Sequence, residues 1–149
     1  MAKMVDIGDK PDVYRRATAS GVIRLKPGTV RAIRAGRIEK GDVLAAAEIA
    51  ALHAMKAVWQ VLPHTHPIPI TAASVTFETG TDRVVAMTTV EATYKTGVEM
   101  EALYGVAVAL LTVWDMAKSL EKDRRGQYRQ ARIEDIHVIE KTKGRRPRR

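Results

Sequence analysis

Apolar and polar positions along the chain follow two kinds of pattern, which separate predicted strands from predicted helices. β-branched or loosely alternating runs predict four strands, at residues 17–25, 70–79, 84–95 and 132–140. Start and stop signals predict three helices, at residues 29–35, 43–62 and 98–121. The order β-α-α-β-β-α-β predicts an α+β fold, an antiparallel sheet with helices packed on one face.

Single residues set the predicted boundaries. Thr29 and Asp42 are candidate N-caps of the first two helices, and Gly36 closes the first. Residues 1–16 lack a clear period and are expected to form an extended arm. Prolines exclude helix in the stiff linker after residue 62, at Pro63, Pro67 and Pro69. The polar residues 122–131 are expected to form a loop.

The third predicted helix is apolar almost all the way round. Between Ala102 and Trp114 its polar side chains are Tyr104 and Thr112. A helix that lies on a sheet needs one apolar stripe, so a second apolar face must be covered as well. In a chain of 149 residues the expected cover is another subunit. The alternative is a helix wrapped by its own chain, which has little material to spare.

The composition is that of one globular domain, 46% hydrophobic and 28% charged. We expect a cytoplasmic protein without membrane contacts, because we expect no apolar run to be long enough to span a bilayer, and residues 1–10 lack a signal-type stretch. The chain has no cysteine, which excludes disulfides, thiolate catalysis and cysteine-ligated zinc.

The net charge of +8 is concentrated at the C-terminal end. Six basic residues and no acidic ones lie within residues 141–149, so the rest of the chain is nearly neutral. We therefore expect one domain, residues 1–140, and a basic, disordered tail, residues 141–149. A nucleic-acid-binding α+β module that uses this tail is the alternative function, although seven aromatic residues offer no obvious base-stacking surface. A non-catalytic assembly subunit is a third possibility.

Two polar clusters could bind phosphate. Lys40-Gly41-Asp42-Val43 opens a predicted helix, where backbone N–H groups and a lysine can hold an anion; a capped helix with a surface lysine is the alternative. His64-Thr65-His66 lies between prolines and could bind phosphate, bind metal or have a structural role. Zinc needs three or four ligands, so we expect no metal site here.

Two further clusters belong to the third predicted helix. Glu99 and Glu101 near its start are favoured by the helix dipole, and Gly97 before them lets a ligand approach the backbone. Asp115 and Lys118 are spaced i and i+3, so they share a face. They form either a surface ion pair or, if buried, a pair whose lysine pKa moves toward neutrality and suits acid–base catalysis.

Taken together, these runs resemble one family, molybdenum cofactor biosynthesis protein C, the cyclic pyranopterin monophosphate synthases. The resemblance covers about residues 4–141. It rests on Met4-Val5-Asp6, Arg15-Arg16-Ala17, Lys40-Gly41-Asp42-Val43, Ala54-Met55-Lys56, Leu62-Pro63 with His66-Pro67, Lys95-Thr96-Gly97-Val98-Glu99-Met100-Glu101-Ala102-Leu103, Asp115-Met116 with Lys118, and Ile133-Glu134-Asp135-Ile136. The TGVEMEAL run is highly specific, and its combination with KGDV and DMxK makes chance improbable.

The resemblance implies a ferredoxin-like fold and a homohexamer, a trimer of dimers with active sites at subunit interfaces. It implies a lyase that converts 3′,8-cyclo-7,8-dihydroguanosine 5′-triphosphate to cyclic pyranopterin monophosphate and pyrophosphate. No redox cofactor is expected, although Mg²⁺ can accompany the triphosphate. Specific nucleic-acid binding is not expected.

The resemblance also implies the site residues. Asp115 and Lys118 are the central catalytic pair, and Lys40 is a second catalytic lysine. The substrate would be bound by His64, Thr65, His66, Glu99, Met100, Glu101, Lys56 and Arg15. The chain departs from the family at His64-Thr65, where an apolar residue and a cysteine are usual, and at residues 119–132, which are longer and more basic than expected.

Overall fold

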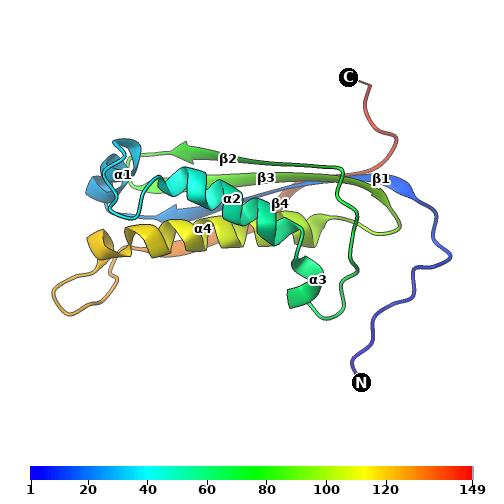
Figure 1. Ribbon diagram of the computed structural model, residues 1–149. Coiled ribbons are helices and arrows are strands. Elements are labelled where there is room, and N and C mark those ends of the chain that lie inside the picture. Colours follow the sequence, from blue (N-terminus) through cyan, green and yellow to red (C-terminus); the bar gives the residue numbers. More distant parts are fainter. Residues whose placement is uncertain (149) are drawn as a thin grey trace.

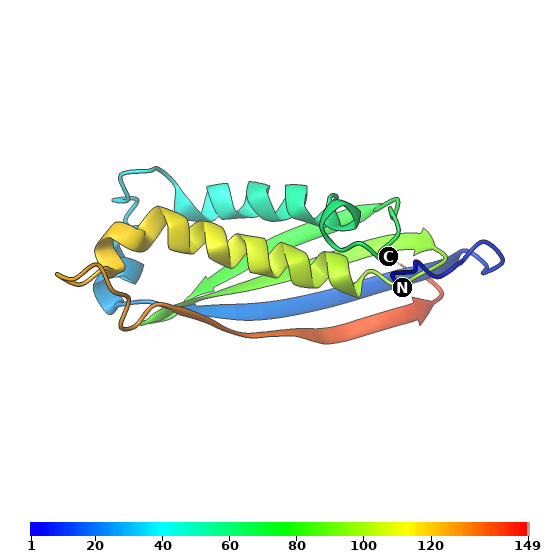
Figure 2. The same ribbon diagram turned by 90° about the horizontal axis from the view of Figure 1, so that it is seen from below.

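A four-stranded antiparallel sheet, covered by helices on one face, forms the computed structural model, which describes residues 1–148 (Figures 1 and 2). The strands are β1 (Val13–Arg24), β2 (Ala72–Thr79), β3 (Arg83–Tyr94) and β4 (Arg132–Gly144), in the order β2-β3-β1-β4. The helices are α1 (Pro27–Arg34), α2 (Val43–Met55), α3 (Val58–Val61) and α4 (Glu99–Glu121). The predicted α+β, ferredoxin-like arrangement is confirmed.

Several boundaries differ from those predicted. The first strand begins at Val13, inside the expected arm, because it pairs with β3 on one side and β4 on the other. The last strand runs to Gly144, so the expected domain boundary at residue 140 falls within a strand. The single helix predicted for residues 43–62 is instead two helices, α2 and α3, separated by a turn after Met55. Val58, the first residue of α3, is buried.

The two predicted helix caps have different outcomes. Asp42 is the N-cap of α2, where its carboxylate accepts the backbone N–H of Ala45 at 3.0 Å. Thr29, in contrast, lies inside α1, whose N-cap is Lys26. Its buried hydroxyl donates a hydrogen bond to Glu121 at the end of α4 instead. A tertiary contact has therefore replaced the local cap.

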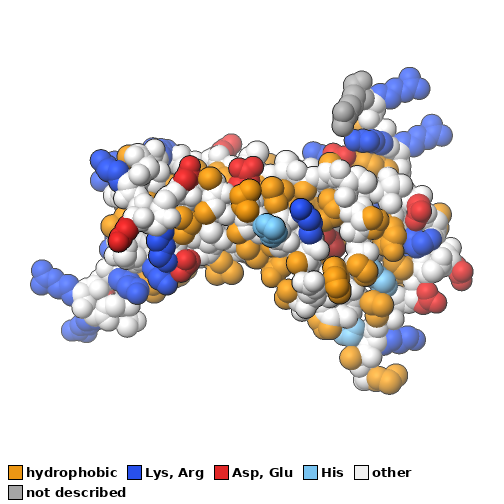
Figure 3. Space-filling view, viewed as in Figure 1, with side chains coloured by type: hydrophobic (Ala, Val, Ile, Leu, Met, Phe, Trp, Pro, Cys, Tyr) orange, Lys and Arg blue, Asp and Glu red, His pale blue; other side chains and the backbone are white. Residues whose placement is uncertain are grey.

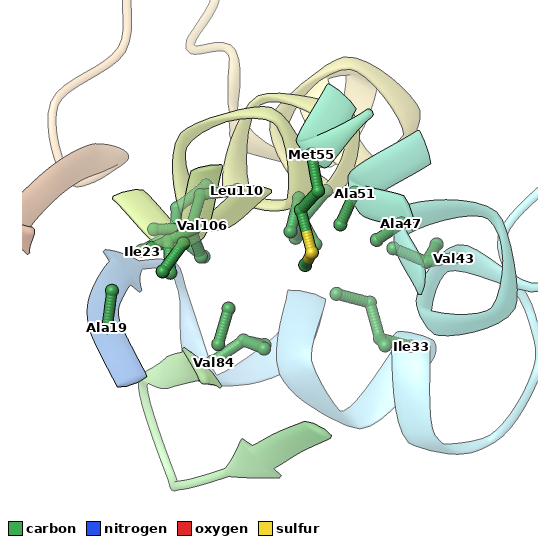
Figure 4. Close-up of a cluster of buried hydrophobic side chains, with 14 of the residues drawn as sticks. Ala19, Ile23, Ile33, Val43, Ala47, Ala51, Met55, Val84, Val106 and Leu110 are labelled. Atoms are coloured by element: carbon green, nitrogen blue, oxygen red, sulfur yellow. The ribbon is translucent and has the colours of Figure 1, made fainter. Parts of the chain in front are cut away.

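The core lies between α4, α2 and the central strands (Figure 4). Two glycines allow the close approach. A Cβ on Gly21 of β1 would come within 2.7 Å of Val106 and 3.0 Å of Leu110 on α4. A Cβ on Gly105 of α4 would come within 2.7 Å of Met55 on α2. The centre of α4 is thus held against both the sheet and α2.

Helix α4 is long and apolar enough to cross a membrane by length and composition, so the expectation that no segment would be was wrong. In this fold it is a core helix, and residues along its length are fully buried against the sheet and α2. Its outer face stays uncovered, with Leu111 58% exposed and Met100 42% exposed. Apolar side chains gather on the side of the molecule formed by α2 and α4 (Figure 3).

Candidate functional site

Three charged side chains from two distant segments meet near the C-terminal end of α4. Lys118 Nζ donates a hydrogen bond to Asp115 Oδ1 at 3.0 Å, as the i, i+3 spacing predicts. Lys40 Nζ donates to Asp115 Oδ2 at 3.1 Å and to the Asp115 carbonyl oxygen at 3.2 Å. We call Lys40, Asp115 and Lys118 the α4 charge cluster.

The turn before α2 brings Lys40 to this cluster. Gly41 has a φ of +111°, a backbone conformation that side chains rarely tolerate, so glycine is required between Lys40 and Asp42. Asp42 caps α2 while Lys40 reaches across to α4. The Lys40-Gly41-Asp42-Val43 run therefore contributes both a helix cap and a cation to the cluster.

The pKa values of Asp115 and Lys118 favour the charged form of each of these two groups. Hydrogen bonds from Lys118 and then Lys40 lower the pKa of Asp115 below its ordinary value. The hydrogen bond to Asp115 raises the pKa of Lys118. The Lys118 side chain is 41% exposed, so burial does not move its pKa toward neutrality as the sequence had suggested it could. In the single chain, Lys118 is an ammonium.

Two cavities adjoin the α4 charge cluster. One, of about 430 Å³, is lined by Leu111, Trp114, Asp115, Lys118, Tyr128 and Ile133. The other, of about 380 Å³, includes Lys40, Asp115 and Lys118 in its lining, together with residues of the turn before α2. Both volumes lie in the range of small-molecule sites, about 300–1,000 Å³.

A second group of predicted site residues lies at the opposite end of α4. His64, Thr65, His66, Glu99, Met100 and Glu101 line one cavity of about 330 Å³. A ring nitrogen of His66 is 2.8 Å from the Val5 carbonyl oxygen, and Thr65 donates its hydroxyl to the Leu62 carbonyl at 2.8 Å. The N-terminal arm thus contributes to this cavity. We call it the histidine–glutamate pocket.

Within the described residues 1–148, two side chains at this end of α4 have buried polar atoms without hydrogen-bond partners. Glu101 is 3% exposed, and its Oε2 has no hydrogen-bond partner. Burial, assisted by the nearby Glu99, raises the pKa of Glu101 to about 7. Arg15 donates to the Lys95 carbonyl at 3.3 Å, but its buried Nε has no partner. Glu101 lines the histidine–glutamate pocket, and a buried group of this kind in a cavity is a candidate for contact with a ligand.

Glu99 differs from Glu101 because it is paired. It forms a salt bridge with Lys141 of β4 at 2.7 Å. Burial pushes the pKa of Glu99 upward, but hydrogen bonds from Lys141 and the backbone outweigh it, so the pKa is lowered. Lys141, expected in a disordered tail, is therefore part of the folded sheet beside this pocket.

Lys56 lies next to the same region, in a separate groove. It is the C-cap of α2 and lines a cavity of about 500 Å³ with Leu52 and Ile68. Ile68 also lines the histidine–glutamate pocket, so the two hollows are neighbours. Within residues 1–148, no group of three or more histidine and carboxylate side chains could hold a metal ion.

Comparison with known proteins assigns the chain to a family. The family model described as "MoaC family" matches residues 4–144. The chain belongs to the MoaC family. It is 56% identical over 141 residues to the "probable cyclic pyranopterin monophosphate synthase" of Pyrococcus furiosus, a match that covers 95% of this chain and 90% of that protein.

Other relatives of this MoaC-family chain are similar over the same length. The "probable cyclic pyranopterin monophosphate synthase" of Thermococcus kodakarensis is 56% identical over 95% of this chain and 91% of its own. A Methanothermobacter thermautotrophicus protein named "probable cyclic pyranopterin monophosphate synthase accessory protein" is 53% identical over 95% of this chain and 89% of its own.

Within this MoaC-family chain the two groups of predicted site residues remain apart. Glu101 and Asp115 are fourteen residues apart on α4, which places them about 20 Å apart along the helix axis. Lys40 and Lys118 share one end of the helix, and His66 and Arg15 share the other. We call these two separate groups of predicted site residues, the α4 charge cluster and the histidine–glutamate pocket, the two half-sites.

Proposed function

We propose that this MoaC-family chain converts 3′,8-cyclo-7,8-dihydroguanosine 5′-triphosphate to cyclic pyranopterin monophosphate and pyrophosphate, as a lyase of molybdenum cofactor biosynthesis. Family membership and the names of the relatives support the product. The observation that carries the proposed chemistry is the α4 charge cluster, a carboxylate between two ammonium groups at the edge of two cavities.

The reaction makes two demands on the site. A purine-derived ring must open and reclose, which requires proton transfers, and a sugar hydroxyl must attack the α-phosphate and expel pyrophosphate. Lys118, charged and hydrogen-bonded to Asp115, acts as a proton donor in this proposal. Once deprotonated, its amine acts as a base in a later step. Lys40 supplies a second positive charge that stabilises phosphate oxygens.

The histidine–glutamate pocket and the residues beside it supply the remaining binding groups in this proposal. His66, Arg15 and Lys56 contribute cationic or donor groups toward the triphosphate. Glu101, whose pKa is about 7, can either donate or accept a proton near neutral pH. Mg²⁺ can accompany the triphosphate, but the proposed proton transfers use side chains of the chain itself.

The separation of the two half-sites supports assembly from more than one chain. We propose a cytoplasmic homohexamer, a trimer of dimers, in which the histidine–glutamate pocket of one subunit adjoins the α4 charge cluster of another. The exposed apolar face of α4 and the distance of about 20 Å between half-sites both favour an active site completed by a partner.

The deciding experiment is incubation of the purified chain with the cyclised triphosphate, followed by detection of pyrophosphate and the pterin product. We expect both to form in equal amounts with wild-type protein, and neither with a Lys40→Ala, Lys118→Ala double variant. An Arg31→Ala variant is the matched control, because Arg31 is an exposed cation on α1 and lies outside the linings of the cavities at both half-sites. Absence of both products with folded wild-type protein would contradict the proposal.

The nucleic-acid alternative has a test of its own. Deleting residues 145–149 removes four arginines and leaves β4 complete. A synthase is expected to keep its turnover after this deletion, whereas a nucleic-acid-binding module is expected to lose affinity for duplex DNA. The open face of the sheet offers Thr18, Ser20 and Thr89 near its centre, which are poor stacking groups.

A further inference from the structure

The loop after α4 folds into a defined turn. The Asp123 carboxylate accepts hydrogen bonds from the backbone N–H groups of Arg125 at 2.8 Å and Gln127 at 3.0 Å. Gly126 has a φ of +75°, which favours glycine, and Lys122 forms an antiparallel bridge with Tyr128. These contacts return the chain to α4 and hold Tyr128 at a fixed place beside it.

Tyr128 packs against the residue that precedes Asp115. The rings of Tyr128 and Trp114 lie edge to face, with centroids 5.1 Å apart and an interplanar angle of 67°. Both rings line the cavity of about 430 Å³ to which Asp115 and Lys118 also contribute. The apolar part of this cavity and the charged pair are therefore parts of one lining.

This combination matches the chemistry of a flat, charged heterocycle. Aromatic side chains bind purine-like rings by stacking, while nearby ionic groups orient their polar edges and phosphates. Leu111 and Ile133 extend the apolar lining without adding polar groups that would need partners. A phosphate alone would gain nothing from these surfaces, so the lining favours a ligand with a ring.

We propose, on the basis of the proposed function, that Tyr128 and Trp114 form an aromatic wall that binds the purine-derived ring of the substrate beside Lys118. Residues 122–131 are then part of the substrate site. Tyr128 acts as a binding residue, positioning the ring so that Lys118 and Asp115 reach it. Its proton is not needed for the reaction, so the ring of Tyr128, and not its hydroxyl, carries the effect.

The kinetic test compares two substitutions of Tyr128 with one of its neighbour. Tyr128→Leu removes the aromatic ring and is expected to raise KM for the cyclised triphosphate on the order of tenfold, with a smaller change in kcat. Tyr128→Phe keeps the ring and is expected to keep KM. Gln127→Leu is the control, because Gln127 is exposed and its backbone, not its side chain, holds the turn.

A binding test uses fluorescence and does not depend on turnover. The chain has two tryptophans, so Trp59→Phe leaves Trp114 as the single reporter. We expect GTP, used as the probe, to quench Trp114 emission in this background. Adding Tyr128→Leu is expected to weaken GTP binding on the order of tenfold, whereas adding Gln127→Leu is expected to leave it unchanged.

The outcomes separate this inference from the proposed function. Wild-type turnover with an unchanged KM and GTP affinity in folded Tyr128→Leu protein overturns the aromatic wall alone. If the wild-type protein shows no turnover but GTP quenches Trp114, and Tyr128→Leu weakens this binding, the ring site is supported and the proposed synthase activity is contradicted. If Tyr128→Leu does not fold, Ile133→Phe narrows the same cavity from β4, and an unchanged KM in that variant overturns the inference.

Discussion

Asp115 accepts hydrogen bonds from two ammonium groups, and this arrangement favours the charged forms of Asp115 and Lys118. The two lysines lower the pKa of Asp115, and Asp115 raises the pKa of Lys118. Near neutral pH the α4 charge cluster therefore carries an excess positive charge. A phosphorylated ligand can enter without first having to displace a proton from Asp115.

We expect Lys118→Ala to lower kcat/KM on the order of a hundredfold or more, because the proton-transfer group is lost. The fold is expected to persist, since alanine is a strong helix former. Lys118→Arg separates the two roles of the residue: it keeps the charge but cannot lose a proton, so it is expected to fail as well if Lys118 acts as an acid–base group. Pyrophosphate release measures each variant, and near wild-type turnover in folded Lys118→Ala protein would contradict the assignment.

Glu101 makes the folded state less stable as the pH rises, the opposite of what a salt-bridged carboxylate does. Its pKa rises from the ordinary value of 4.5 to about 7 in the fold, so the folded chain binds this proton more tightly than the unfolded chain. Stability is therefore lost as the pH rises from 4.5 to 7, by up to about 3 kcal/mol. Glu101→Gln is expected to remove this loss, as measured by urea unfolding at pH 5 and pH 8.

Glu99 provides the control for this prediction. Its pKa is lowered, so its contribution to stability is present at neutral pH and is lost as the pH falls through its folded pKa. Glu99→Gln should therefore change the pH dependence with the opposite sign. If the unfolding free energy of Glu101→Gln protein depends on pH as strongly as that of the wild type, the raised pKa of Glu101 is contradicted.

At the scale of elements, the sequence predicted what local signals encode. The β2–β3 hairpin follows from β-branched runs around a Gly-containing turn, and α4 from its long apolar run. The start of β1 and the end of β4 could not be predicted, because these segments are strands through pairing with each other and not through their own periodicity. The role of Thr29 depended on Glu121, ninety-two residues later in the chain.

The contact between α4 and β1 requires glycine at position 21. A Cβ there would come within 3.0 Å of side-chain atoms from Val106, Leu110 and Ile136, and Val106 and Leu110 are fully buried. Gly21→Ala is therefore expected to destabilise the fold by about 1–3 kcal/mol through overpacking. Chemical denaturation measures the change.

Gly28→Ala is the matched control for that prediction. A Cβ at Gly28 would meet a single atom of Arg31, at the ordinary distance of 3.7 Å, and Gly28 lies in the first turn of α1. Alanine there is expected to leave stability unchanged or to increase it by up to about 1 kcal/mol. Equal effects of the two substitutions would show that close packing at Gly21 is not the cause.

For the whole molecule, the candidate site residues could be named from motifs, but how the fold groups them could not be predicted. Asp115 and Lys118 are paired by helix spacing alone, whereas the contact of Lys40 with Asp115 depends on the turn at Gly41 and on how α2 packs beside α4. The burial of Glu101 and Arg15 likewise follows from tertiary packing. The length of α4 keeps the two half-sites apart, so a site that uses both would have to be completed between subunits.

We expect the purified chain to sediment as a hexamer, six times the chain mass of 16.5 kDa, with the outer face of α4 covered by a neighbouring subunit. Ala107→Glu places a charge on that face, one turn before Leu111 and outside the linings of the cavities at both half-sites, and is expected to lower the assembled mass. Ile49→Glu is the matched control, since Ile49 is 56% exposed on α2.

Sedimentation and turnover measured on the same preparations decide what the assembly does. If active sites are completed between subunits, Ala107→Glu must lose turnover together with assembled mass, although each chain retains Lys40, Asp115, Lys118 and the cavity linings. Loss of the hexamer with Ile49→Glu instead would place the contact on α2. A monomeric wild-type chain with full turnover would contradict both the hexamer and the shared site, because the half-sites about 20 Å apart would then have to act within one chain.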